Sequence, residues 1–124
     1  MQVREIMKEA RVINKDISLA EAAEIMSANG LSSLLFVRGN RIRGILTERD
    51  LLKNFNKQEM ASNVMSKKVI VIGPDEEIGT ALEIMKDYKK KKLPVVEGGK
   101  LIGVVNLIDI AMHADDLGEG FFFD

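Results

Sequence analysis

The chain has 124 residues and a formal net charge of -1, so its length suits one domain with a modest core and its charge gives no general attraction to nucleic acid or anionic membranes. It has no cysteine, which excludes disulfides and thiolate metal sites and fits a reducing, cytoplasmic location. Its apolar runs are far shorter than the roughly 18 residues of a membrane span, and the charged N-terminus lacks a secretory apolar segment.

The first half of the chain predicts three short strands and two helices. Apolar segments between turn-forming residues indicate strands at 12–13, 34–37 and 41–46. The first helix should begin at Ser18, where Glu21 completes a capping-box pattern, and end at Gly30 in the left-handed conformation. The second and third strands should form a hairpin across the Gly-Asn pair at 39–40, and a second helix should follow to about residue 54.

The second half repeats this order at a constant offset, so the chain contains an internal duplication. Strands are expected at 69–72, 93–96 and 100–105, with a hairpin turn at the Gly-Gly pair. A helix should begin at Asp75 or Glu76, and Pro94 indicates that its strand starts at a sheet edge. We therefore expect one repeat at residues 1–56, a second at 57–114 and a tail at 115–124, with a polar linker at 55–61.

Each half contains one polar pair at a strand-to-helix junction. Thr47 stands at a helix start with Asp50 three residues later, and Asn106 and Asp109 occupy the matching positions. Unpaired N–H groups at a helix start can hold a phosphate, and a neighbouring carboxylate can accept hydrogen bonds from a sugar diol. The same pattern also occurs at ordinary helix starts, so the residues alone leave a nucleotide site and a plain helix cap both open.

The duplicated β-α-β-β-α unit, the Leu-Pro-Val-Val segment before a glycine turn and the Gly-apolar-apolar-Thr-x-x-Asp junction resemble paired cystathionine β-synthase (CBS) domains. The resemblance covers residues 3–113. It implies an α/β (α+β) fold in which two CBS repeats pack about a pseudo-two-fold axis. It further implies a homodimeric regulatory module without catalysis, whose clefts bind AMP, ADP, ATP or S-adenosylmethionine and which acts on an attached or partner protein.

The resemblance also implies the binding residues. Asp50 would hold the ribose hydroxyls and Thr47 the phosphate end, while two lysines replace an Arg/His pair that often reaches the phosphates. One cleft would then contain Thr47, Asp50, Ile70, Val71, Ile72, Lys91, Lys92 and Pro94. The other would contain Val12, Ile13, Asn14, Ser32, Ser33, Leu35, Asn106 and Asp109. Because only the first set has cations, we expect a phosphorylated ligand to bind there first.

Other interpretations remain beside this one. A ligand-free interaction scaffold of the same fold is the alternative function, favoured by Asn106 where the family usually has Thr or Ser; Asn106 should still cap its helix. No nucleophile–base pair or metal cluster indicates an enzyme, and no cofactor is required. The tail residues Phe121 to Phe123 either fray or dock into a groove. Apolar helix residues are expected to build the homodimer: Leu19, Ile25, Met26, Ile78 and Met85.

Overall fold

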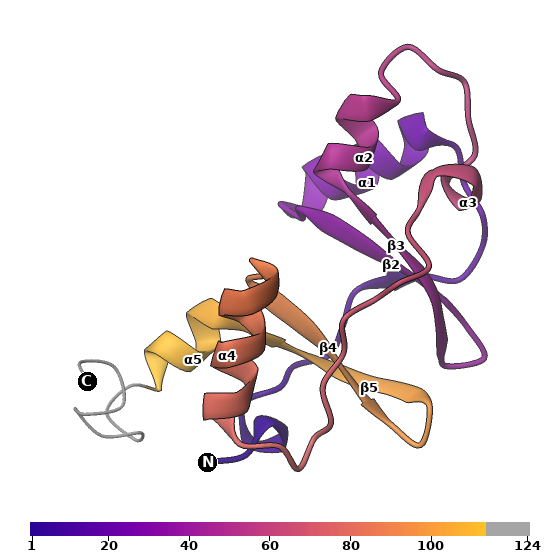
Figure 1. Ribbon diagram of the computed structural model, residues 1–124. Helices are drawn as coiled ribbons and strands as arrows, with labels where there is room; N and C mark the ends of the chain where they lie inside the picture. The colour runs from indigo at the N-terminus through magenta and orange to yellow at the C-terminus, as the bar shows by residue number, and fades with distance from the viewer. Residues whose placement is uncertain (114–124) are drawn as a thin grey trace. The chain divides into compact units, whose positions relative to one another are not determined.

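The computed structural model describes residues 1–113, and it confirms a mixed α/β chain in which a β-α-β-β-α unit is followed by a similar unit without the first strand (Figure 1). The chain divides into two compact units. The first unit contains residues 11–69, and the second unit contains residues 1–10 together with the described chain from residue 70. These packing units begin and end elsewhere than the predicted repeats at 1–56 and 57–114. The predicted docking of the tail lies outside the described residues.

The first unit is a three-stranded sheet with helices. Its elements are β1 (Val12–Ile13), α1 (Leu19–Asn29), β2 (Ser33–Arg38), β3 (Arg41–Thr47), α2 (Glu48–Lys53) and α3 (Ala61–Val64). Strand β2 pairs in parallel with β1 and antiparallel with β3, and the β2–β3 turn points away from α1 and α2 (Figure 1). The sequence predicted these elements except α3, a single turn in which Ala61 is fully buried.

The turn and cap predictions are confirmed where backbone chemistry decides them. Gly39 and Asn40 both have positive φ, 59° and 62°, as do Gly98 and Gly99 at 58° and 78°. Positive φ at both central residues is the geometry of a type I′ turn, whose twist matches that of the flanking strands. Helix α1 ends as predicted at Gly30 in the left-handed conformation. At its start only half of the predicted box forms, because Ser18 accepts the bond but Glu21 returns none.

The second unit contains a two-stranded sheet. Its elements are the 3-10 helix η1 (Val3–Glu5), α4 (Ile78–Tyr88), β4 (Lys92–Glu97), β5 (Lys100–Asn106) and α5 (Leu107–Met112). The predicted strand at 69–72 is wrong, because within this stretch only Ile72 pairs, in a single parallel bridge to Val95. In the first unit the equivalent pairing extends to Leu35, whereas here Pro94 occupies that place. Proline has no N–H to donate, so the ladder cannot lengthen.

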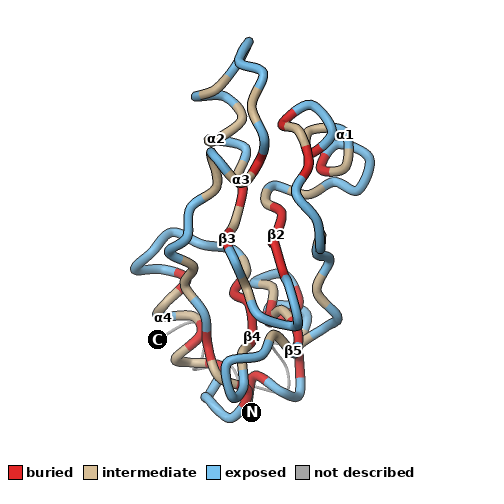
Figure 2. The backbone as a smooth tube through the Cα atoms, turned by 90° about the vertical axis from the view of Figure 1, so that its right-hand side faces the viewer, coloured by how far each residue is buried: buried red, intermediate tan, exposed pale blue. Residues whose placement is uncertain are grey.

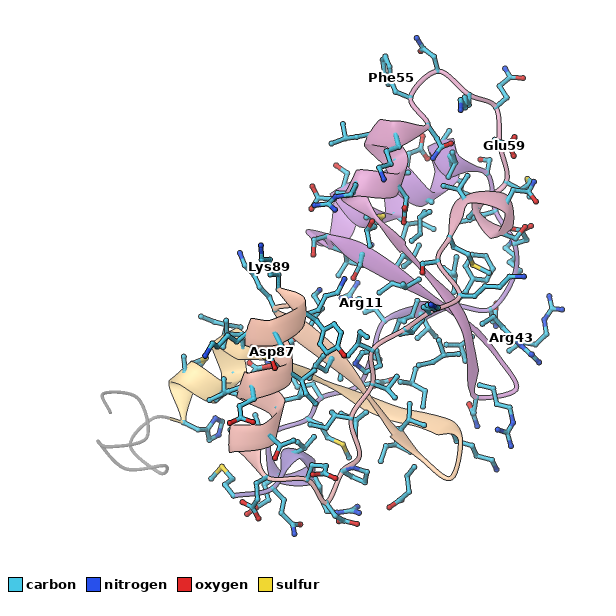
Figure 3. The ribbon with its side chains drawn as sticks, in the orientation of Figure 1. Arg11, Arg43, Phe55, Glu59, Asp87 and Lys89 are labelled. Carbon is cyan, nitrogen blue, oxygen red and sulfur yellow. The ribbon has the colours of Figure 1, made fainter. Side chains whose placement is uncertain are left out.

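Helix α4 also begins later than predicted. Its first residue follows Glu77, whose side chain makes no capping bond, instead of starting at Asp75 or Glu76. The Asp75 carboxylate is used elsewhere, since Oδ1 accepts hydrogen bonds from Arg4 Nε and Nη2 at 3.2 and 2.9 Å. At the other end, Lys89 closes α4 at φ 55°, where the first repeat has a glycine, and its side chain extends from the helix end (Figure 3).

Each unit is completed by a segment that precedes a repeat and docks on the last strand of a hairpin. In the second unit, the N and O atoms of Lys8 bond with O and N of Val104, both at 2.8 Å. In the first unit, Ser66 and Ile45 make the same two bonds at 2.9 Å. The N-terminal segment therefore does for the second unit what α3 and the residues after it do for the first.

Two glycines make this docking possible. An added Cβ at Gly44 would lie 2.7 Å from Met65 Sδ and 2.9 Å from the Ser66 carbonyl oxygen. At Gly103 it would lie 2.9 Å from the Lys8 carbonyl oxygen. These separations are too short for a side chain, so the docked backbone requires glycine at both places. The glycine that begins the duplicated Gly-apolar-apolar-Thr-x-x-Asp pattern is thus required by backbone packing, independently of any ligand.

The two units have separate cores, seen as buried positions along β2 and β4 in Figure 2. Leu19 and Met26 are buried in the first core, and Ile78 and Met85 are buried in the second. For these four residues the predicted role in a dimer is wrong, because each helix uses its apolar face to cover its own sheet. Ile25 is only half-buried, and the dimer itself stays a prediction. The large apolar side chains exposed on or next to the described helices are different ones and include Leu52, Phe55, Met60, Tyr88, Leu107, Ile108 and Met112. Among the described residues, no helix has the length and apolar character to cross a membrane.

Candidate ligand-binding site

Thr47 and Asp50 form a closed polar pair where β3 passes into α2. Asp50 Oδ2 accepts hydrogen bonds from Thr47 N at 2.8 Å and from Thr47 Oγ1 at 3.0 Å. Thr47 Oγ1 in turn accepts from Asp50 N at 3.3 Å. Within residues 1–113, no partner bonds the other carboxylate oxygen, Oδ1, and Asp50 is half-buried. The carboxylate is thus fixed through one oxygen and has the second available.

The helix start itself offers less than the sequence suggested. The N–H groups of Thr47 and Asp50 are used inside the pair, and Glu48 N donates to the Ser32 carbonyl oxygen at 3.1 Å. Helix α2 has only six residues, so few aligned peptide dipoles add up at its start. Fewer backbone N–H groups are therefore free to hold a phosphate here than the sequence suggested, so side chains would have to contribute.

The first unit brings together half of the predicted binding residues. Ser33 pairs with Thr47 across β2 and β3, and Val12 pairs with Leu35 across β1 and β2. The predicted residues that lie in this unit are Val12, Ile13, Asn14, Ser32, Ser33, Leu35, Thr47 and Asp50. Ser33 and the Thr47–Asp50 pair therefore lie on neighbouring strand ends.

The matching pair of the second unit has a different arrangement. Asn106 makes no capping bond, so the prediction that it caps α5 is wrong. Its Nδ2 donates to Asp109 Oδ2 at 3.0 Å instead, which turns the amide away from the helix N–H groups. Asp109 Oδ1 lies 2.8 Å from Lys8 Nζ, and Asp109 is only 4% exposed. Both oxygens of this carboxylate are therefore engaged.

The charge state of Asp109 follows from these contacts. Burial raises the pKa of the Asp109 carboxyl. The hydrogen bonds from Lys8 and Asn106 and the charges of Lys8 and His113 together lower the pKa by more than burial raises it, so it lies below its ordinary value. Asp109 is therefore ionised at neutral pH. Sequence reasoning missed Lys8, because it lies at the opposite end of the chain and no spacing rule connects it to Asp109.

A pocket of about 560 Å³ opens beside this pair in the second unit. Its lining residues are Lys91, Lys92, Asn106, Leu107, Ile108 and Ala111. Lys92 pairs with Asn106 across β4 and β5, and Leu107 N donates to the Lys91 carbonyl oxygen at 2.7 Å. The volume lies within the range of roughly 300–1,000 Å³ typical of small-molecule sites. Two ammonium groups and an apolar wall suit a ligand with an anionic group and a flat ring.

The second unit also contains the remaining predicted residues. Ile70, Val71 and Ile72 precede α4, and Ile72 N donates to the Pro94 carbonyl oxygen at 3.0 Å. Each predicted cleft combines residues of both units, such as Asp50 with Lys91. That combination stays a prediction.

The duplicated pattern has a counterpart among known families. A sequence model described as the CBS domain matches residues 3–57 and again residues 61–116. The chain belongs to the CBS-domain family. It is 35% identical over 106 residues to an inosine-5′-monophosphate dehydrogenase of Korarchaeum cryptofilum and 36% identical over 105 residues to an uncharacterized 17.7 kDa protein of Acidianus ambivalens. These stretches cover 85% and 81% of this chain but only 22% and 64% of the two relatives.

Solved CBS structures share this fold. The CBS domain pair of protein MJ0100, crystallised in complex with 5′-methylthioadenosine and S-adenosyl-L-methionine, is 25% identical with a TM-score of 0.79. The comparison covers 95% of this chain and 98% of that one. A signal-transduction protein with CBS domains from Burkholderia ambifaria is 26% identical with a TM-score of 0.77, covering 96% and 98% of the two chains.

Proposed function

We propose that this CBS pair is a cytoplasmic regulatory module that binds an adenosine compound and performs no chemistry itself. The observation that carries the proposal is the Asp50 carboxylate, held through one oxygen by Thr47 with the other unengaged among the described residues. It lies at a junction that recurs in both CBS repeats. The MJ0100 pair, which is similar over nearly its whole length, was crystallised with two adenosine ligands.

The chemistry of these groups selects the ligand class. A carboxylate has only acceptors, so it suits the two hydroxyl donors of a ribose, and bonds to an ionised acceptor are roughly twice as strong as neutral ones. Lys91 and Lys92 supply positive charge for a phosphate or another anionic group, but without the planar fork of arginine. AMP, ADP, ATP and S-adenosylmethionine are therefore the compounds to test, with the phosphorylated ones favoured.

A regulatory role is consistent with how this sequence occurs elsewhere. The stretch similar to this chain forms only 22% of the Korarchaeum dehydrogenase, so in that protein it accompanies a much larger remainder. We propose that this module regulates an attached or separate protein. We also propose a homodimer, built by exposed residues such as Leu52 and Ile108. A monomer mass of 13.8 kDa by light scattering at micromolar concentration would contradict the dimer.

Calorimetric titration of the full chain with adenosine, AMP, ATP and S-adenosylmethionine tests the ligand proposal. The variant is Asp50→Asn, whose amide oxygen can still accept from Thr47 but whose charge is lost. A hydrogen bond to a charged group is worth about 1.5–3 kcal/mol, so the dissociation constant should rise roughly 10- to 150-fold. Glu48→Gln, an exposed change on the same helix, is the matched control and should bind like the wild type. Equal affinity of Asp50→Asn and wild type would remove Asp50 from the site.

A ligand-free scaffold is the second candidate function. The observation in its favour is that Asp109, the carboxylate of the second repeat, is fully engaged by Lys8 and Asn106. Thermal shift separates the two candidates, because a ligand at 100 times its dissociation constant stabilises the folded chain by about 2.7 kcal/mol. No shift with any of the four compounds would favour the scaffold.

A further inference from the structure

The duplication supplies an internal comparison between two carboxylates at equivalent positions. Asp50 and Asp109 each follow a hairpin strand on which a segment docks through the same pair of backbone hydrogen bonds. The residue at the docking point differs, since it is Ser66 in the first unit and Lys8 in the second. The side chain at the docking point is therefore the first place to look for a difference between the two carboxylates.

The two side chains behave differently because of their lengths. Lys8 extends to Asp109, with Nζ 2.8 Å from Oδ1, while Asn106 donates to Oδ2 at 3.0 Å. Ser66 Oγ instead bonds within its own segment, accepting from Lys68 N at 3.3 Å. A serine hydroxyl is too short to do what the lysine does. The first carboxylate keeps an oxygen without a partner among the described residues, whereas the second has both oxygens occupied.

We propose that Lys8 determines the ligand stoichiometry, because its ammonium group occupies the position at Asp109 that a ribose diol would need. This inference rests on the proposed adenosine-binding function. A ligand at Asp109 has to displace a charge-assisted bond that forms within the chain and is therefore present at every ligand concentration. The Lys8 side chain is 63% exposed, so it can turn toward water when its contact with Asp109 is broken. The wild-type chain then binds one equivalent, at the Asp50 carboxylate.

The test exchanges the docking residue between the repeats. Lys8→Ser places the first unit's residue in the second unit, and Lys8→Arg is the control that keeps a cation within reach of Asp109. Titration with adenosine and with AMP should give one equivalent per chain for the wild type and for Lys8→Arg. It should give two for Lys8→Ser, and the second should be lost again in Lys8→Ser with Asp109→Asn. Lys8→Met, which keeps the aliphatic stem but has no donor for Asp109, should also bind two and serves if the serine variant does not melt cooperatively.

The outcomes separate this inference from the proposed function. One equivalent in the wild type and one or none in Lys8→Ser and Lys8→Met would overturn the role of Lys8 and leave the proposed function standing. Weaker binding in these variants would make Lys8 a direct ligand contact. No binding by the wild type, with binding by Lys8→Ser that depends on Asp109, would support the role of Lys8 and contradict the proposed function. Absence of binding by every variant would contradict both.

Discussion

Replacement of Gly44 by alanine should destabilise the first unit by pushing the docked segment off β3. The added Cβ would lie 2.7 Å from Met65 Sδ and 2.9 Å from the Ser66 carbonyl oxygen. The methionine side chain can move, but the carbonyl belongs to the backbone that makes both bonds with Ile45. Overpacking of this kind typically costs about 1–3 kcal/mol. Gly103→Ala should act in the same way in the second unit through the Lys8 carbonyl at 2.9 Å.

Gly73 provides the matched control. A Cβ there would have only Glu76 Cγ nearby, at 3.8 Å, which is ordinary contact, so Gly73→Ala should be neutral or slightly stabilising. Thermal unfolding followed by circular dichroism measures the difference. For a unit of this size each kcal/mol corresponds to about 4–8 °C, so Gly44→Ala should melt at least about 4 °C below Gly73→Ala. Equal melting temperatures for these two variants would refute the argument that close docking requires glycine.

Two further predictions concern charge. The hydrogen bond from the Ser62 hydroxyl holds the pKa of Asp16 below its ordinary value, despite some burial. The stabilisation from this contact is therefore complete above the ordinary pKa and is lost as pH falls through the lowered one. The Ser62 amide donates to Asp16 Oδ1 at 3.0 Å, so its hydrogen-exchange protection factor should fall in that acid window. A protection factor that stays constant across the window would contradict this. Replacement of Lys91 and Lys92 together by alanine should weaken ATP more than adenosine and reduce the salt dependence of ATP binding, as calorimetry at two ionic strengths would show; an equal loss for both compounds would exclude a phosphate contact.

Local chemistry determined the parts of this protein that the sequence predicted. The two hairpin turns follow from Gly39-Asn40 and Gly98-Gly99, because positive φ at both central residues is favourable for few residue types. Helix α1 ends where Gly30 permits the left-handed conformation. Periodic apolar residues placed the helices and most strands correctly. The Thr47–Asp50 pair also follows from the sequence, since its four hydrogen-bonding groups lie within four consecutive residues.

Pairing and burial across the chain determined the rest. The stretch before α4 has the apolar composition of a strand, but its partner contains Pro94, which cannot donate the bond that would extend the ladder. Asn106 is a residue type that often caps helices, but the nearby Asp109 offers its side-chain amide a charged acceptor. Local propensity cannot predict the missing ladder, because it depends on which residue the fold brings opposite. The contact between Asn106 and Asp109 is local, but an asparagine amide can either cap a helix or donate to the carboxylate, and residue type alone does not choose between the two.

The sequence by itself therefore determined the duplication, the family, most of the elements and the local Thr47–Asp50 pair. Only the tertiary structure decided that the N-terminal segment completes the second unit and that Lys8 reaches Asp109. The physical reason is distance along the chain. Turns, caps and amphipathic faces leave a periodic or neighbouring signal in the sequence, whereas an ion pair between the two ends of the chain leaves none until the backbone has folded.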